Sequence, residues 1–142
     1  QLYKKGFETR NTDPIEAYAY ALICKDVALK SKSLKHIAKS YNLLGILHYK
    51  KGDYTQALDF QNQALKLNQI IHNEIGIAIN YTNLGNIYSE THDLYKAEFY
   101  YLNAQTKQAL CLIAKAHSAA NALFYEKQNL CKTQHSQTLS NY

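Results

Sequence analysis

The sequence is poor in residues that break helices and in residues that build covalent or metal-bound frameworks. Among 142 residues there are one Pro, five Gly and three Cys, with neither Trp nor Met. The three Cys are an odd number without CxxC spacing, which excludes a disulfide-dense secreted scaffold and favours free thiols in a reducing compartment such as the cytoplasm. No apolar run approaches the roughly 20 residues that a membrane-spanning helix needs. The abundant Ala, Leu, Lys and Gln instead favour an all-α protein.

The charge is uneven along the chain. The net charge is +5, and residues 1–51 carry ten Lys or Arg against four Asp or Glu, whereas residues 52–142 carry six against seven. A basic surface can meet nucleic acid or an acidic peptide, but lysines spread over solvated helix faces explain the excess more simply. The sequence begins with Gln1 and shows no signal-peptide pattern, so we expect a trimmed or partial chain. An exported protein whose signal has been removed is the alternative.

Motifs for catalysis are missing from the sequence. It has no Gly-rich phosphate loop, no nucleophile elbow and no paired carboxylates, and its six His show no spacing typical of a zinc site. These are His36, His48, His72, His92, His117 and His135. We therefore expect a protein that is not an enzyme and that has no catalytic residues, metal or cofactor.

An internal repeat organises the chain. The stretch from Ile37 to Gln69 recurs imperfectly from Ile77 to Ala109, and a fixed period of this size indicates an array of helical repeats. Eight identities at an offset of forty residues support it: Ile37/Ile77, Ala38/Ala78, Tyr41/Tyr81, Leu44/Leu84, Gly45/Gly85, Asp53/Asp93, Ala57/Ala97 and Ala64/Ala104.

Turn residues divide these repeats into helices. Asp13, Asp53 and Asp93 are forty residues apart, and each is placed to cap the start of a helix. Gly52 supplies the left-handed stop before Asp53, but His92 takes its place before Asp93, so we expect a looser second turn. The expected helices span residues 14–30, 34–51, 54–71, 74–91 and 94–108.

The two ends depart from the repeat. Residues 1–12 have no sustained period and contain Gly6, so we expect a frayed N-terminal remnant, followed by a half repeat over 13–33 that carries Cys24 as a buried free thiol. Full repeats follow over 34–73 and 74–111. We then expect a capping helix over 112–132, because terminal repeats must cover an apolar face, and a polar tail over 133–142. The apolar stripe of the capping helix is Leu110, Ile113, Ala116, Ala120, Leu123 and Phe124.

The signature positions resemble a tetratricopeptide repeat. The pattern is Tyr41-x2-Leu44-Gly45-x11-Ala57-x6-Ala64, with Tyr in the usual place of Trp. His48 and Gln61 depart from the family pattern, which the second copy restores with Tyr88 and Tyr101. The forty-residue period is longer than the usual thirty-four and resembles the long-helix repeats of bacterial sensor and regulator proteins.

The resemblance covers about residues 13–125 and implies an all-α solenoid of antiparallel helix pairs in a right-handed superhelix. In this family the first helix of each pair lines a concave groove that binds peptide or protein segments. The corresponding positions here are Lys39, Asn42, Leu43, Ile46, Tyr49, Lys50, Ile79, Thr82, Asn83, Asn86, Ser89 and Glu90.

Two features of these positions suggest how a peptide is read. Asn83 and Asn86 lie one helical turn apart, and an amide offers the donor and the acceptor that a peptide backbone needs. Polar solvated surface is the alternative. Lys39 and Lys50 are placed to hold an acidic side chain or a C-terminal carboxylate.

The aromatic residues of the last repeat suggest a second kind of contact. Tyr101 fits a core position, so Phe99 and Tyr100 cannot both face inward with it. One of them would then form an exposed patch for self-association, unless the C-terminal helix buries it.

The sequence therefore predicts a protein–protein interaction module that binds a peptide or protein segment, within a larger signalling or regulatory protein. A structural element that forms a homo-oligomer is the alternative. Nucleic acid is the least favoured partner, and it would contact Lys30, Lys32, Lys35 and Lys39.

Overall fold

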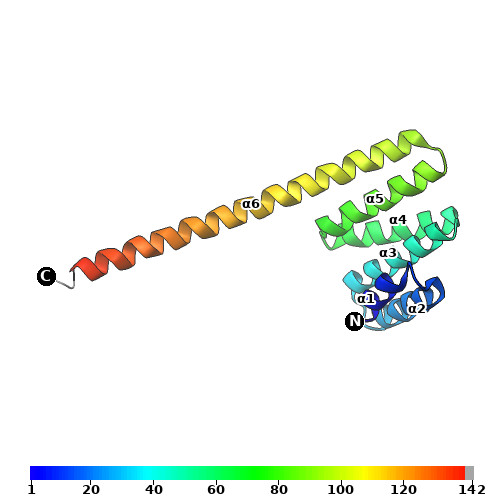
Figure 1. Ribbon diagram of the computed structural model, residues 1–142, viewed down its shortest axis with the longest axis horizontal. Coiled ribbons are helices and arrows are strands. Elements are labelled where there is room, and N and C mark those ends of the chain that lie inside the picture. The colour runs from blue at the N-terminus through cyan, green and yellow to red at the C-terminus, as the bar shows by residue number, and fades with distance from the viewer. Residues whose placement is uncertain (140–142) are drawn as a thin grey trace. The chain divides into compact units, whose positions relative to one another are not determined.

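The computed structural model describes the chain from residue 1 to residue 139, with side chains described except at 120, 124 and 127–139. The described residues form six helices and no strand: α1 (Leu2–Thr9), α2 (Pro14–Lys30), α3 (Leu34–Lys50), α4 (Tyr54–Ile70), α5 (Glu74–Glu90) and α6 (Leu94–Leu139). Each of the first four helices packs on the next, in antiparallel order (Figure 1). This confirms the predicted all-α solenoid.

The turns between helices repeat every twenty residues. At these turns four residues occupy the left-handed region: Lys32 (φ +52°), Gly52 (φ +77°), His72 (φ +51°) and His92 (φ +60°). Each is followed by a backbone N–H that donates to a carbonyl five residues earlier, as in the bond from Asp53 to His48 at 3.0 Å. This is the closure expected when a left-handed residue ends a helix.

The expectation of a looser turn at His92 is wrong. The Asp93 N–H donates to the Tyr88 carbonyl at 2.9 Å, which is as short as the corresponding bond at Gly52. The Asp93 carboxylate then accepts from the Lys96 N–H at 3.2 Å and caps α6, as Asp53 caps α4 through Gln56. Backbone closure and the cap together hold the His in a conformation that Gly would adopt more easily.

Small residues allow the helices to approach closely. Ala57, Ala64, Ala97 and Ala104 are at most 4% exposed, as the repeat pattern predicts. An apolar cluster joins Ala17 and Ala21 of α2 to Leu43, Leu44 and Leu47 of α3. Leu43 is therefore a core residue, and its predicted place in the groove is wrong.

The cysteines of the described side chains are free. Cys24, which we expected to be buried, is only half-buried on α2, and burial raises the pKa of its thiol. Cys111 on α6 is also half-buried.

The N-terminal segment is better ordered than the sequence suggests. Residues expected to fray form α1, which packs on α2 and on α3. Gly6 lies at this contact, because a Cβ there would stand 3.0 Å from both Leu43 and Tyr20 side-chain carbons. The close approach that only Gly permits explains why a residue that reads as a breaker lies inside a packed helix.

The C-terminal part also differs from expectation. By its internal contacts the chain divides into a unit of residues 1–108, here called the repeat unit, and a unit that starts at Ala109. No turn marks this division, because α6 continues unbroken from Leu94 to Leu139. Residues 109–132 contain no Gly or Pro that would stop a helix.

The predicted boundary between a repeat ending at 111 and a capping helix over 112–132 is therefore not a helix boundary. The polar tail predicted over 133–142 is helical as far as residue 139. In the apolar stripe Leu110, Ile113 and Leu123 are exposed, whereas the side chains of Ala120 and Phe124 and the last three residues lie outside the described residues. The capping role itself stays a prediction.

Candidate functional site

The repeat unit contains a pocket on the side formed by α1, α3 and α5. Its volume is about 410 Å³, and residues of these three helices form its walls, while Gln61 of α4 lies at its base. The lining residues are Tyr3, Phe7, Arg10, Asn42, Gly45, Ile46, Tyr49, Lys50, Gln61, Ile79, Asn83, Asn86 and Ile87.

Seven of the predicted groove residues line this pocket: Asn42, Ile46, Tyr49, Lys50, Ile79, Asn83 and Asn86. Four do not. Lys39 lines a separate hollow beside Cys24 and His36. The Thr82 hydroxyl donates to the carbonyl of Ala78 on its own helix. Ser89 and Glu90 lie beyond the pocket, where Glu90 accepts a hydrogen bond from the Tyr49 hydroxyl at 3.4 Å.

The sequence did not reveal the third wall of the pocket. Tyr3, Phe7 and Arg10 come from the N-terminal segment that we expected to fray. The Arg10 guanidinium stacks over the Phe7 ring at 3.6 Å from its centroid. The signal that could have found this helix is Gly6, which precedes the repeat glycine Gly45 by nearly one period.

The base of the pocket is formed by a buried amide in place of an aromatic ring. Gln61 is completely buried, and its Nε2 donates to the backbone carbonyl of Asn42 at 3.1 Å. A Cβ at Gly45 would stand 2.6 Å from this Nε2. Gly85 and Tyr101, forty residues later, form the same kind of contact, with the Tyr101 ring 2.7 Å from such a Cβ. Gln61, which stands where the family pattern has an aromatic residue, thus places a hydrogen-bonding amide where a ring would otherwise pack.

Gln61 belongs to a chain of amides that crosses the repeat unit. The Asn80 Nδ2 donates to the Gln61 Oε1 at 2.8 Å, and the Asn68 Nδ2 donates to the Asn80 Oδ1 at 2.7 Å. The Asn73 Nδ2 donates in turn to the Asn68 Oδ1 at 2.8 Å. Gln61, Asn68 and Asn80 are at most 5% exposed. Their burial is compatible with stability because every amide is paired.

The same chain reaches the wall of the pocket at Asn42. The Asn42 Oδ1 accepts from the Asn83 Nδ2 at 2.9 Å and more weakly from the Asn80 Nδ2 at 3.4 Å. Beside it, burial raises the pKa of the Tyr3 phenol, and the Asn42 amide opposes that shift. On the opposite side of the pocket, the Asn86 Oδ1 accepts from the Tyr101 hydroxyl at 2.8 Å.

Two cations line the pocket without a carboxylate partner among the described residues. Arg10 bonds to the backbone carbonyl of Phe7, and Lys50 bonds to the amide oxygen of Asn11. The four ion pairs of the described residues all lie elsewhere. With Ile46 and Ile79 also in the lining, the pocket combines apolar contact surface with unneutralised positive charge.

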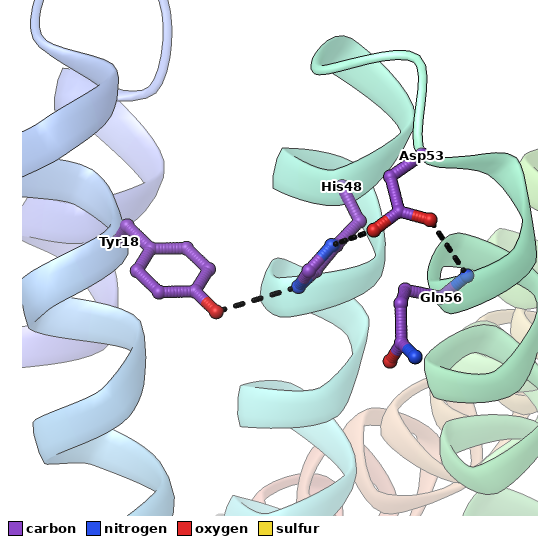
Figure 2. A network of polar contacts seen from close by, with 4 residues as sticks. All are labelled: Tyr18, His48, Asp53 and Gln56. Carbon is purple, nitrogen blue, oxygen red and sulfur yellow. Dashed lines mark hydrogen bonds and ion pairs between the residues drawn. The ribbon is translucent and has the colours of Figure 1, made fainter.

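A second polar network joins three helices away from the pocket (Figure 2). The His48 Nδ1 lies 3.1 Å from the Asp53 Oδ2, and its Nε2 lies 3.4 Å from the Tyr18 hydroxyl. Asp53 also caps α4 by accepting from the Gln56 N–H at 3.2 Å. His48 replaces the family Tyr on the predicted core face, and the network provides the partners that a half-buried imidazole needs. It contains no group placed to act on a substrate in the pocket.

The aromatic residues of α6 separate into an inner and an outer set. Tyr100 is half-buried and stacks on Tyr88, with ring centroids 5.4 Å apart and planes 2° apart. Phe99 is 55% exposed, and its neighbours on the same surface, Tyr95 and Leu102, are 84% and 62% exposed. Only Phe99 of the predicted pair is therefore available for a contact with another chain.

Within the part of the chain that the structure describes, no cluster of three or more His, Cys, Asp or Glu could hold a metal ion. Across the same residues, no helix combines the length and hydropathy needed to cross a membrane.

Comparison with known proteins identifies similar chains. A tetratricopeptide repeat family model matches residues 36–105. The uncharacterized protein ycf37 of Pyropia yezoensis is 32% identical over 126 residues, an alignment that covers 72% of this chain and 67% of that protein. The crystal structure of the TPR domain of Arabidopsis FLU superposes with a TM-score of 0.70 at 24% sequence identity, over 77% of this chain and 92% of the FLU domain.

Proposed function

Because this chain belongs to the tetratricopeptide repeat family, whose members generally mediate protein–protein interactions, we propose that its pocket binds a protein segment combining apolar and acidic side chains. The observation that supports this proposal is the combination of apolar and cationic residues that line the pocket. Ile46 and Ile79 offer apolar contact, and Arg10 and Lys50 have no carboxylate partner among the described residues. A charge-assisted hydrogen bond to a carboxylate is roughly twice as strong as a neutral one, so an acidic residue is the complementary partner.

The dimensions of the pocket fit a short segment. Ligand pockets commonly enclose about 300–1,000 Å³, and this one encloses about 410 Å³. We propose that the segment belongs to another protein and that the repeats serve a larger signalling or regulatory assembly, as the family resemblance implies.

The proposal is tested with two peptides of opposite charge. The hexapeptide acetyl-Leu-Glu-Leu-Glu-Leu-Glu-amide should bind with measurable heat in calorimetry, and its Leu-Lys counterpart should not. Lys50→Glu should weaken binding of the acidic peptide at least tenfold. Lys66→Glu is the matched control, since Lys66 is an exposed lysine of α4 outside the pocket. Equal effects of the two substitutions would show general charge attraction and refute the proposal.

A second candidate function is self-association through α6. The observation that favours it is the exposure of Phe99 together with Tyr95 and Leu102. Light scattering coupled to size exclusion over a range of concentrations tests it. A dimer that Phe99→Ser abolishes would support self-association, and a monomer at every concentration would refute it.

A further inference from the structure

A second hollow lies beside the pocket, between the N-terminal end of α2 and the C-terminal end of α3. Its volume is about 360 Å³, and its lining residues are Pro14, Ile15, Tyr18, Leu47, Lys50 and Lys51. Only Lys50 also lines the pocket described above. This second space, here called the α2–α3 hollow, is therefore a separate candidate site.

The lining of the α2–α3 hollow is mostly apolar. Leu47 is only 3% exposed, whereas Ile15 is 85% exposed and leaves most of its side chain uncovered. An exposed Ile is common at a protein surface, so the apolar lining alone does not identify a ligand. The groups around it decide what it can bind.

Tyr18 forms a wall of the hollow and is held in place by its neighbours. Its hydroxyl lies 3.4 Å from the His48 Nε2, and its ring meets the His48 imidazole edge-on, with ring centroids 5.7 Å apart (Figure 2). His48 is held in turn by the Asp53 carboxylate, which lies 3.1 Å from its Nδ1. A side chain that is fixed before binding loses little conformational entropy when a ligand packs on it.

Two lysines give the hollow positive charge. Neither Lys50 nor Lys51 has a carboxylate partner among the described residues. The Lys51 ammonium lies over the Tyr18 ring, 5.7 Å from its centroid. The Asp13 carboxylate caps α2 and is not part of the lining. The hollow thus offers an anion two cations that no described carboxylate neutralises.

Cations at the C-terminal end of a helix also stabilise its dipole, so the next repeat provides a comparison. Forty residues later, Glu90 and Thr91 occupy the positions of Lys50 and Lys51. Helices α3 and α5 both have 17 residues, so a helix of this array ends at the same place without a cation. The two lysines are therefore a feature of the α2–α3 junction, which favours a binding role.

We propose that the α2–α3 hollow is a second binding site, for a protein segment in which a large apolar side chain stands next to acidic residues. The apolar side chain packs on Ile15 and on the Tyr18 ring, and an acidic side chain pairs with Lys51. Charge complementarity selects such a segment, because a basic one would meet two cations. The inference goes beyond the proposed function, since Ile15, Tyr18 and Lys51 lie outside the pocket lining.

The tripeptide acetyl-(4-fluoro-Phe)-Glu-Glu-amide tests the site by fluorine NMR on the full chain. Lys51→Glu should weaken its binding about tenfold, because the substitution removes an ion pair and adds a like charge. Ile15→Thr introduces the residue type that stands forty residues later, at Thr55. It should weaken binding about threefold by removing apolar contact. Both substituted residues are exposed, so neither substitution disturbs the core.

Matched controls are Lys66→Glu on α4 and Ile75→Thr on α5, both at exposed positions outside the hollow. Neither should change the affinity for the tripeptide. A neutral tripeptide with Gln in place of both Glu should bind the wild type more weakly than the parent does. A loss as large in Lys66→Glu as in Lys51→Glu, or no binding of the parent tripeptide at millimolar concentration, would overturn the inference.

Ile79→Thr separates this site from the pocket of the proposed function, because Ile79 lines the pocket and not the hollow. It should weaken the acidic hexapeptide and leave the tripeptide unaffected. A tripeptide that responds to Ile79→Thr but not to Ile15→Thr occupies the pocket, and the inference is then wrong while the proposed function stands. Failure of the hexapeptide alone refutes only the proposed function. Overhauser contacts from the fluorinated ring to the Tyr18 ring of the wild type would support the placement without any variant.

Discussion

Replacing Gly45 by Ala tests the packing at the base of the pocket. The new Cβ would stand 2.6 Å from the Gln61 Nε2 and 3.0 Å from its Cδ and Cγ, distances that a carbon atom cannot occupy without displacement of its neighbour. Gln61 is completely buried and is bonded to the Asn42 carbonyl and to Asn80. It cannot move away without giving up these hydrogen bonds.

The expected free-energy change follows from three effects. Ala is favoured over Gly inside a helix by about 1 kcal/mol, which opposes the destabilisation. Overpacking costs about 1–3 kcal/mol, and a buried amide group left without a partner costs a further 1–3 kcal/mol or so. We expect Gly45→Ala to lower the free energy of unfolding by about 2–4 kcal/mol.

Urea unfolding followed by circular dichroism measures this change. In a Gln61→Ala background, Gly45→Ala should cost less than it does in the wild type, because the added methyl then occupies space that the glutamine vacates. Gly85→Ala is an informative comparison, since its opposing Tyr101 ring is 37% exposed and can move toward solvent at a lower cost. A Gly45→Ala protein as stable as the wild type would show that Gln61 moves freely and would refute the reasoning.

Four further predictions follow from the turns, the amide chain and the titratable groups. His92→Gly should raise the free energy of unfolding, measured by urea unfolding, by about 1 kcal/mol, because His92 has φ +60° and a side chain disfavours this left-handed conformation. Gly52→Ala should lower the free energy of unfolding by a similar amount for the same reason. Asn80→Ala should cost about 3 kcal/mol in the same assay, since it leaves buried partners unpaired. Burial raises the pKa of the Tyr3 phenol in the folded protein. The contribution of the neutral Tyr3 side chain to the free energy of unfolding is therefore fully present below about pH 10, the ordinary tyrosine pKa, and is lost as the pH rises through the folded pKa. Tyr3→Phe should therefore reduce the alkaline loss of stability, and an unchanged alkaline transition would contradict this. The pKa of the half-buried Cys24 thiol is also raised, so at pH 8 it should react with iodoacetamide more slowly than in the urea-unfolded chain, and equal rates would contradict the assigned burial.

The positions of the helices were largely predictable because their signals are local. A left-handed residue and a capping Asp or Asn lie within two positions of each other at Gly52, His72 and His92. Helices α3, α4 and α5 therefore end within one residue of their expected limits, whereas α6 runs well past its own. Helix α1 was missed for the opposite reason. Its Gly6 reads as a breaker until Leu43 and Tyr20 are seen to approach it.

The polar interior was not predictable from the sequence. Asn68 and Asn80 occupy helices, where an amide side chain is usually solvated, and nothing next to them in the sequence indicates burial. Asn80 of α5 bonds to both Asn68 and Gln61 of α4, so the partners come from two different helices. The placement of Asn83 and Asn86 in the pocket was predictable from helical spacing, but the atom that each presents depends on Asn42 and Tyr101. Which atom each amide presents is decided by contacts between helices, so it cannot be predicted from the sequence of one helix.

The amide chain also affects how the repeat unit unfolds. In a repeat array, stability is the sum of what each repeat contributes alone and what each contact with a neighbouring repeat contributes. Asn80 and Asn83 of the second full repeat bond to Asn42 of the first, so detaching either repeat breaks hydrogen bonds that join the two. Unfolding one repeat while the other stays folded therefore costs free energy. The repeat unit should lose its structure in a single cooperative transition, without fraying one repeat at a time.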